Sequence, residues 1–514
     1  MGVMRFIVVP DGKTIDWPEY EAAYITQLDG RVAPLRVELQ GNLLQCTRSN
    51  SDSGKLHIPW RVEGFGLPII TTTSLPESDR PYHLTLELAR GKIAETREQA
   101  YLWETAGMLI PDNFRSQIKL AYQLFSKASA NRNHPTLVDD YSQQALTQAF
   151  RAADVLGGSY AIQRFKSRMQ SLSHRPALLG CTVDESLSVE VLKDLFCSTF
   201  SAAVVPVEWN RIEPTEGNYN WQSLDDLVSC CQQQRMFVRG GPLIDLSAGG
   251  LPQWLTTWKD DFLNLQSFVC DFIETAVSHY AGQIRMWEVV ARPNTGGGLR
   301  LTEEQRLALT ARSLEAAQRT DTEAQLFIRI DRPWGDYQAG GQHRLTPIQF
   351  VDALVRSSLG LSGVNLEIAV GYHPQGSRHR DLLAVSRLID VWSLLGIQLH
   401  VTLSFPSSAT KDSQAVQEVA VGRSECGVDW SEEVQSHWAS RYVTLLMSKP
   451  AVTGVFWTHF SDGFPHRFPN AGIIRPDGSQ KPVVKVLRSH GRKSSQDLPA
   501  NPDGTVGEGT WISE

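Results

Sequence analysis

Eight short apolar segments, separated by stretches of helical periodicity, dominate the chain from residue 176 onward. Each is almost continuously apolar and bounded by turn-forming residues, the pattern of strands buried on both faces of a parallel sheet. The predicted strands span 177–181, 201–209, 236–245, 284–294, 324–331, 364–372, 397–405 and 452–462. Because each is followed by an amphipathic stretch, the pattern predicts an α/β fold, a closed (β/α)8 TIM barrel. An open, doubly wound sheet is the competing arrangement, and the strand count and spacing favour closure.

Two of the intervening helices have recognisable first residues. Thr302 is followed three residues later by Gln305, the spacing of a capping box. Thr346 is followed by Pro347, which combines an N-cap residue with proline at the first helical position. We therefore expect helices to begin at these two threonines.

The chain before the barrel shows two further patterns. Residues 1–90 contain short alternating segments, including 82–88, between turn-forming clusters, and predict a β-sandwich-like module that either covers the barrel or binds carbohydrate. Residues 91–175 have helical spacing and predict a helical linker or collar. The barrel domain is predicted at 176–490, and the polar segment 491–514 is predicted to be a disordered tail.

Composition excludes several classes of protein. A net charge of -7 provides no basic surface, so nucleic acid and anionic membranes are not expected partners. No apolar stretch approaches the roughly 20 residues of a membrane span or resembles a signal peptide, which predicts a cytoplasmic protein. The seven scattered cysteines imply no disulfide framework. No cluster has zinc-ligand spacing and no phosphate-binding loop is complete, so we expect neither a metal nor a cofactor. The oligomeric state is left open.

Four segments, in the order of the barrel strands, resemble glycoside hydrolase family 10, the xylanase family. Residues 209–225 contain Trp, then Glu-Pro-x-x-Gly-x-Tyr-x-Trp, and residues 239–255 contain Arg-Gly followed by Leu-Pro-x-Trp. Residues 280–290 contain Tyr-Ala-Gly and then Trp-Glu, and residues 452–482 match the eighth strand and the closing segment. The resemblance implies a TIM barrel and hydrolysis of glycosidic bonds. The matching residues are mostly architectural, so function has to be argued from the site.

The resemblance also implies two catalytic glutamates, an acid/base on strand four and a nucleophile on strand seven. At the matching positions this chain has Arg292 and Leu403. An arginine does not give up a proton near neutral pH, and leucine carries no nucleophile. The chain is therefore expected to bind a saccharide or polyol with little or no ordinary endo-1,4-β-xylanase activity, as a pseudoenzyme.

Other acidic residues lie near the predicted mouth of the barrel. The candidates for relocated catalytic groups are Glu367, Asp331, Glu288 and Asp245. Glu367 lies within an otherwise apolar strand, where a carboxylate is costly unless it is paired. A structural ion pair with an arginine is therefore the alternative role for Glu367.

Aromatic and polar residues at strand ends are candidates for contact with a sugar. They are Trp457, Trp209, Trp254, Glu208 and Arg292. Trp457 matches a residue that forms a sugar platform in the family, and an aromatic face can hold a sugar ring. Packing in the core is the alternative role for Trp457.

Three functions therefore stay open from the sequence. The first is a saccharide-binding barrel without ordinary xylanase activity. The second is an active glycosidase with relocated carboxylates, which would show two inward carboxyl groups at catalytic separation. The third is a non-catalytic scaffold, which would show a mouth filled by side chains.

Overall fold

The computed structural model describes residues 2–8, 17–171, 177–416 and 419–491. The tail predicted at 491–514 thus lies, apart from its first residue, outside the described residues. Within the described ranges, no helix is long and apolar enough to cross a membrane.

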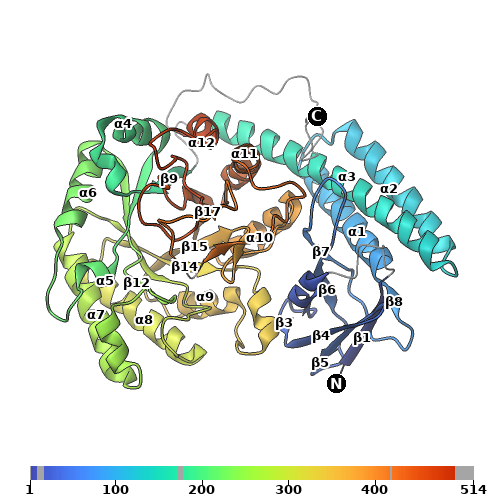
Figure 1. The fold of residues 1–514 in the computed structure, drawn as a ribbon, viewed down its shortest axis with the longest axis horizontal. Coiled ribbons are helices and arrows are strands. Elements are labelled where there is room, and N and C mark those ends of the chain that lie inside the picture. Colours follow the sequence, from blue (N-terminus) through green and yellow to red (C-terminus); the bar gives the residue numbers. More distant parts are fainter. Residues whose placement is uncertain (1, 9–16, 172–176, 417–418, 492–514) are drawn as a thin grey trace.

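Eight parallel strands form a closed barrel, as predicted (Figure 1). They are β9 (Leu178–Thr182), β10 (Ala202–Val205), β11 (Phe237–Gly240), β13 (Met286–Ala291), β14 (Gln325–Asp331), β15 (Leu361–Ala369), β17 (Gln398–Ser404) and β19 (Val452–Trp457). The pairing of β11 with β13 closes the ring, and the short β12 (Ile244–Asp245) continues the third strand beside β13. Pro242 separates β11 from β12, because proline has no N–H for the strand ladder.

Helices surround the barrel between the strands. They are α4 (Glu190–Thr199), α6 (Gln222–Gln233), α7 (Phe262–His279), α8 (Glu303–Thr320), α9 (Pro347–Arg356), α10 (Leu382–Ser393), α11 (Glu432–Ser448) and α12 (Val483–His490). The capping boxes at Thr302 and Thr346 are both formed, which confirms the two predicted helix starts. The strand predicted at 201–209 ends earlier, at Val205, and a short helix α5 (Trp209–Ile212) follows it.

The N-terminal module consists of two four-stranded sheets. One contains β1 (Gly2–Ile7), β4 (Leu35–Gln40), β5 (Leu43–Arg48) and β8 (Tyr82–His83); the other contains β2 (Tyr24–Thr26), β3 (Val32–Ala33), β6 (Lys55–Pro59) and β7 (Ile69–Thr71). The sheets share one apolar core, which includes Met4 and Leu44 from the first sheet and Ile25 and Ile58 from the second. The predicted β-rich N-terminal segment is therefore present.

The strand predicted at 82–88 is wrong, because the chain turns into helix α1 (Leu84–Thr105) after two extended residues. Leu84 and Leu88, one helical turn apart, pack into the core of the two sheets. Leu86 packs on the opposite side, in a cluster with residues of the next two helices. A helix buried on two sides therefore produced the alternation that resembled a strand.

The collar consists of α1, α2 (Asp112–Ala130) and α3 (Pro135–Ser171). The long α3 packs against α10 and α11 on the outside of the barrel, as Figure 1 shows. Buried ion pairs join the collar to the barrel, between Lys92 and Asp381 and between Asp154 and Arg441. All eight barrel strands thus come from residues 178–457, with the collar outside them.

Candidate functional site

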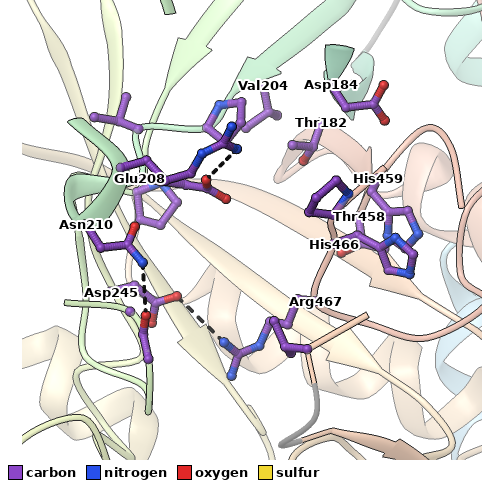
Figure 2. A pocket seen from close by; sticks show the side chains of 18 of the residues that line it. Thr182, Asp184, Val204, Glu208, Asn210, Asp245, Thr458, His459, His466 and Arg467 are labelled. Atoms are coloured by element: carbon purple, nitrogen blue, oxygen red, sulfur yellow. Dashed lines mark hydrogen bonds and ion pairs between the residues drawn. The ribbon is translucent and has the colours of Figure 1, made fainter. Parts of the chain in front are cut away.

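A cavity of about 880 Å³ opens at the carboxyl ends of the barrel strands. Its lining comes from residues that end or follow successive strands, among them Thr182, Asp184, Glu208, Asp245, Arg292, Arg329, His459 and Arg467. Figure 2 shows several of these side chains facing one another across the mouth. This is the end of a TIM barrel at which ligands bind.

Arg292 lies directly after β13 and joins three strand ends. Its Nη2 and Nε donate to the two oxygens of Glu367 at 2.6 and 3.2 Å, and its Nη1 donates to Oδ2 of Asp245 at 2.6 Å. Burial alone would raise the pKa of both carboxyls, but the charges of Arg292 and of the neighbouring arginines, which include Arg467, together with hydrogen bonds, outweigh burial and hold each pKa below its ordinary value. Both carboxylates are therefore ionised at neutral pH, and both are bound by the guanidinium of Arg292.

A second layer of ion pairs lies deeper in the barrel. Glu288 is fully buried and binds Nη2 of Arg329 at 2.6 Å, while Arg329 also reaches Glu367 at 3.3 Å. Asn365 donates to the other oxygen of Glu288 at 2.6 Å and accepts from Thr402 at 3.0 Å. Glu288 therefore has partners on both oxygens and is held away from the cavity.

Arg239 contributes the innermost charge. Its guanidinium lies 3.8 Å from the ring centre of Phe456, and its Nη1 lies 3.2 Å from Nδ1 of His400. Burial lowers the pKa of Arg239 to about 10, so it stays charged at neutral pH. Alternating guanidinium and carboxylate groups thus fill the barrel beneath the cavity.

Asp331 has a different electrostatic environment from the other three acidic candidates. It is buried and accepts a 2.6 Å hydrogen bond from the hydroxyl of Thr295. Burial first, and then the neighbouring charge of Glu367, raises its pKa above the ordinary value. Asp331 does not line the cavity.

The three tryptophans predicted to contact sugar are packed in the protein. Trp457 is 1% exposed, and its Nε1 donates to the carbonyl of Ala471 at 2.7 Å. Trp209 donates to the carboxylate of Glu213, and Trp254 donates to the carbonyl of the same residue. None of the three lines the cavity, whereas the predicted contact residues Glu208 and Arg292 do. The sequence gives no signal for this difference, because both kinds of residue follow strand ends.

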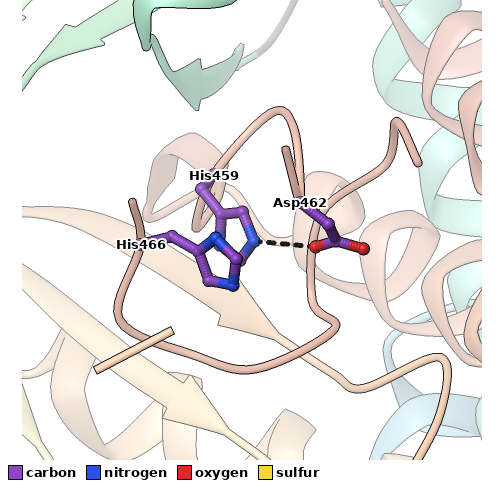
Figure 3. A group of neighbouring side chains, drawn as sticks. All are labelled: His459, Asp462 and His466. Atoms are coloured by element: carbon purple, nitrogen blue, oxygen red, sulfur yellow. Dashed lines mark hydrogen bonds and ion pairs between the residues drawn. The ribbon is translucent and has the colours of Figure 1, made fainter. Parts of the chain in front are cut away.

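Two histidines and an aspartate gather in the loop after β19 (Figure 3). Nε2 of His459 lies 3.2 Å from Oδ1 of Asp462. His466 contacts the carbonyl of Phe464 through Nδ1 at 2.7 Å and the carboxylate of Asp412 through Nε2 at 2.9 Å. Because both of these partners are acceptors, His466 donates from both nitrogens and is an imidazolium ion. Neither histidine was predicted as a site residue from the sequence, and their His-x-x-Asp-x-x-x-His spacing was the available signal.

This cluster does not fit a shared metal ion. The rings of His459 and His466 are stacked, with centres 4.1 Å apart and planes 11° apart. Their in-plane lone pairs therefore run parallel instead of converging, whereas metal ligands point at one centre. Asp462 is also bound by Lys481 and by the backbone N–H of Gly472. The cluster is better described as a hydrogen-bonded wall of the cavity.

His466 is expected to make the stability of the protein depend on pH. Burial alone would lower the pKa of His466, but the hydrogen bond to Asp412 and the charge of Asp412 outweigh burial and raise it. Because the folded-state pKa is raised, the stabilisation is complete below the unfolded value of about 6.5 and is lost as the pH rises through the folded value. The free energy of unfolding should therefore fall between pH 6 and 9 more steeply in the wild type than in His466→Gln, measured by urea denaturation. Equal slopes would contradict the imidazolium assignment.

Comparisons with known proteins agree with the barrel. Residues 177–342 match the model of glycosyl hydrolase family 10. An endo-1,4-beta-xylanase of Agaricus bisporus is 24% identical over 202 residues, which cover 38% of this chain and 56% of that protein. Endo-1,4-beta-xylanase 3 of Hypocrea jecorina is 32% identical over 126 residues, covering 24% of this chain and 35% of that protein. The chain thus spans about half or less of the length of these relatives.

Among solved structures, native xylanase 10B of Thermotoga maritima aligns with a TM-score of 0.47 and 16% identity, over 64% of this chain and 96% of that one. Xylanase 10B of Thermotoga petrophila, solved with xylobiose, aligns with a TM-score of 0.46 and 16% identity, over 61% and 94%. Taken with its eight-stranded topology, the match over residues 177–342 supports a (β/α)8 barrel that is similar to those of glycosyl hydrolases. The family that the barrel resembles is glycosyl hydrolase family 10, and the relatives that match it are named as xylanases.

Proposed function

We propose that the barrel binds a saccharide at its C-terminal mouth and does not hydrolyse xylan by the retaining mechanism. The observation that carries this proposal is the position of Arg292, which forms ion pairs with Glu367 and Asp245 at the same time. A retaining glycosidase needs one protonated carboxyl and one free carboxylate about 5 Å apart. Here Glu367 and Asp245 are ionised and bound to one guanidinium, so neither is ready to donate a proton.

Strand β17 supports the same proposal. It carries no acidic residue along its whole length, from Gln398 to Ser404. Thr402 bonds to Asn365 inside the barrel, so alternation directs Leu403 to the opposite face, toward the helices. A shift of the alignment by one residue in either direction therefore brings Thr402 or Ser404 to the position of the nucleophile, and neither is a carboxylate.

The cavity favours a ligand over a purely structural role. A volume of about 880 Å³ lies within the range of small-molecule sites, whereas a scaffold needs no open mouth. The relatives that match residues of this barrel are named as xylanases, enzymes that act on a polysaccharide. A saccharide is accordingly the ligand class with the most support.

Calorimetric titration with xylo-oligosaccharides of increasing length tests the proposal. We expect saturable binding with a dissociation constant between about 1 µM and 1 mM, which corresponds to about -8 to -4 kcal/mol. Chemically unrelated polyols of the same size serve as the control for specificity. Absence of binding by any saccharide would contradict the proposed function.

A second candidate function rests on Asp331, a buried candidate beside Glu367 whose pKa is raised. Asp331 is the register partner of Glu367 on the adjacent strand, and the charge of Glu367 adds to burial in raising the pKa of Asp331. If these were relocated catalytic groups, the wild type would hydrolyse a glycoside and Asp331→Asn would lower the rate by about 10²- to 10⁴-fold. A screen of aryl glycosides with both proteins measures this. Lack of turnover by the wild type would eliminate this candidate.

A further inference from the structure

Arg467 lies in the loop after β19 and extends across the mouth of the cavity (Figure 2). Its Nη1 donates to the hydroxyl of Ser247 at 2.8 Å, and its Nη2 donates to the side-chain oxygen of Gln375. Both partners are neutral. Two other loops of the mouth thus hold the guanidinium in place without neutralising its charge.

The carboxylate nearest to Arg467 is already bound elsewhere. Among the described residues, only Asp245 lies within ion-pair distance, at 3.9 Å. The same Oδ2 atom of Asp245 accepts from Arg292 at 2.6 Å, which is a much closer contact. The buried Nε of Arg467 has no hydrogen-bond partner in the described part of the chain. Arg467 therefore has an incomplete set of partners.

The other arginines of the mouth differ from Arg467 in this respect. Arg292 binds Glu367 at 2.6 Å, and Arg329 binds Glu288 at the same distance. Arg211, on the rim, lies 3.0 Å from Glu208. Each of these three has a carboxylate at hydrogen-bond distance.

The surroundings of Arg467 combine burial with charges of both signs. Its side chain retains 21% exposure toward the mouth. Burial lowers the pKa of Arg467 and the nearby charge of Arg292 lowers it further, whereas the charges of three acidic residues, Asp245, Glu367 and Asp331, raise it. An anionic group of a ligand at this position would complete the partners of Arg467.

We propose that the mouth selects an acidic saccharide, with the carboxylate of a uronic acid bound by Arg467. This inference rests on the proposed saccharide-binding function and specifies its ligand class. A planar guanidinium presents parallel N–H donors that match the two oxygens of a carboxylate, and a charge-assisted pair of this kind is stronger than a hydrogen bond between neutral groups. A sulfate ester on a sugar offers negative oxygens that a guanidinium also binds, so the experiment includes it as the alternative source of the anion.

Paired ligands test this inference by calorimetry at about 50 mM salt, where charge interactions are weakly screened. Three ligands are compared. They are xylotetraose, xylotetraose that carries one glucuronate, and a sulfated oligosaccharide of the same length. We expect the uronate ligand to bind at least about 10-fold more tightly than the neutral one, which corresponds to about 1.4 kcal/mol. Arg467→Gln should abolish this preference, so that the variant binds the uronate ligand and xylotetraose with affinities within about 2-fold of each other.

Arg211→Gln is the matched control, since Arg211 also lines the mouth but is paired with Glu208. It should keep the preference for the uronate ligand. Thermal unfolding of both variants checks that they fold. If Arg467→Gln does not fold, the wild type should still lose its preference as salt rises from about 50 to 500 mM.

The possible failures are distinguishable. Equal affinity for neutral and uronate ligands, or a preference that survives Arg467→Gln, would overturn the inference and leave saccharide binding intact. If the sulfated ligand binds more tightly than the uronate ligand, the anion recognised by Arg467 is a sulfate ester, and the assignment to a uronic acid is overturned. Absence of binding by all three ligands would overturn both this inference and the proposed function.

Discussion

Purified protein incubated with xylan is expected to release no reducing sugar above background. The residue that follows β13 is Arg292, which stays protonated at any ordinary pH and is bound to two carboxylates. General acid catalysis alone contributes about 10²- to 10⁴-fold to the rate of such reactions. The absence of an acidic residue on β17 removes the covalent step as well. The rate should therefore lie at least about 10⁴-fold below that of a xylanase.

The measurement compares this protein with the Agaricus bisporus endo-1,4-beta-xylanase under the same conditions. An epoxide or fluorosugar inactivator, which requires an attacking carboxylate, should label the fungal enzyme and leave this chain unlabelled. Hydrolysis at ordinary xylanase rates would contradict the proposal. A covalent adduct on Glu367, Asp245 or Asp331 would show that the catalytic groups have moved, and mass spectrometry of peptides identifies the modified residue.

Replacement of Glu367 by glutamine is expected to destabilise the fold by about 3 kcal/mol. Glu367 is 4% exposed and neutralises part of the charge of both Arg292 and Arg329. Removing one partner of a buried ion pair leaves an uncompensated charge, which is far more costly than losing a surface pair. Equilibrium unfolding in urea measures the difference in the free energy of unfolding.

The matched control is Glu208→Gln. Glu208 also pairs with an arginine at the mouth, but its side chain is 48% exposed and that of Arg211 is 59% exposed. The expected loss is below about 1 kcal/mol, because solvent screens an exposed pair. A Glu367→Gln protein with unchanged stability that lost turnover on a glycoside would instead assign Glu367 to catalysis.

The strand and helix pattern of the barrel could be predicted from the sequence because it depends on local properties. Apolar runs, turn residues and the caps at Thr302 and Thr346 act within a few residues of one another, and all eight predicted strands overlap observed ones. The absence of a carboxylate along β17 is likewise a property of the sequence itself. The local pattern gave a wrong prediction at residues 82–88. Helix α1 is buried on two sides there, so its apolar residues, such as Leu84 and Leu88, alternate with others as they would in a strand.

The partners of the site residues depended on the tertiary structure. Arg292, Glu367 and Asp245 come from three different strands, and only barrel closure brings them within hydrogen-bond distance. The sequence suggested an arginine partner for Glu367, but it did not indicate that one guanidinium would bind two carboxylates.

By itself, the sequence determined a (β/α)8 barrel without the acidic residues expected on its fourth and seventh strands, because strand periodicity and residue identity are local. Only the tertiary structure decided which side chains face the cavity. It buried Trp457 against Ala471 and placed Arg467 beside Ser247, from a different loop of the mouth. The physical reason is that the direction and partners of a side chain depend on packing between segments distant in the chain, and no local pattern records that packing.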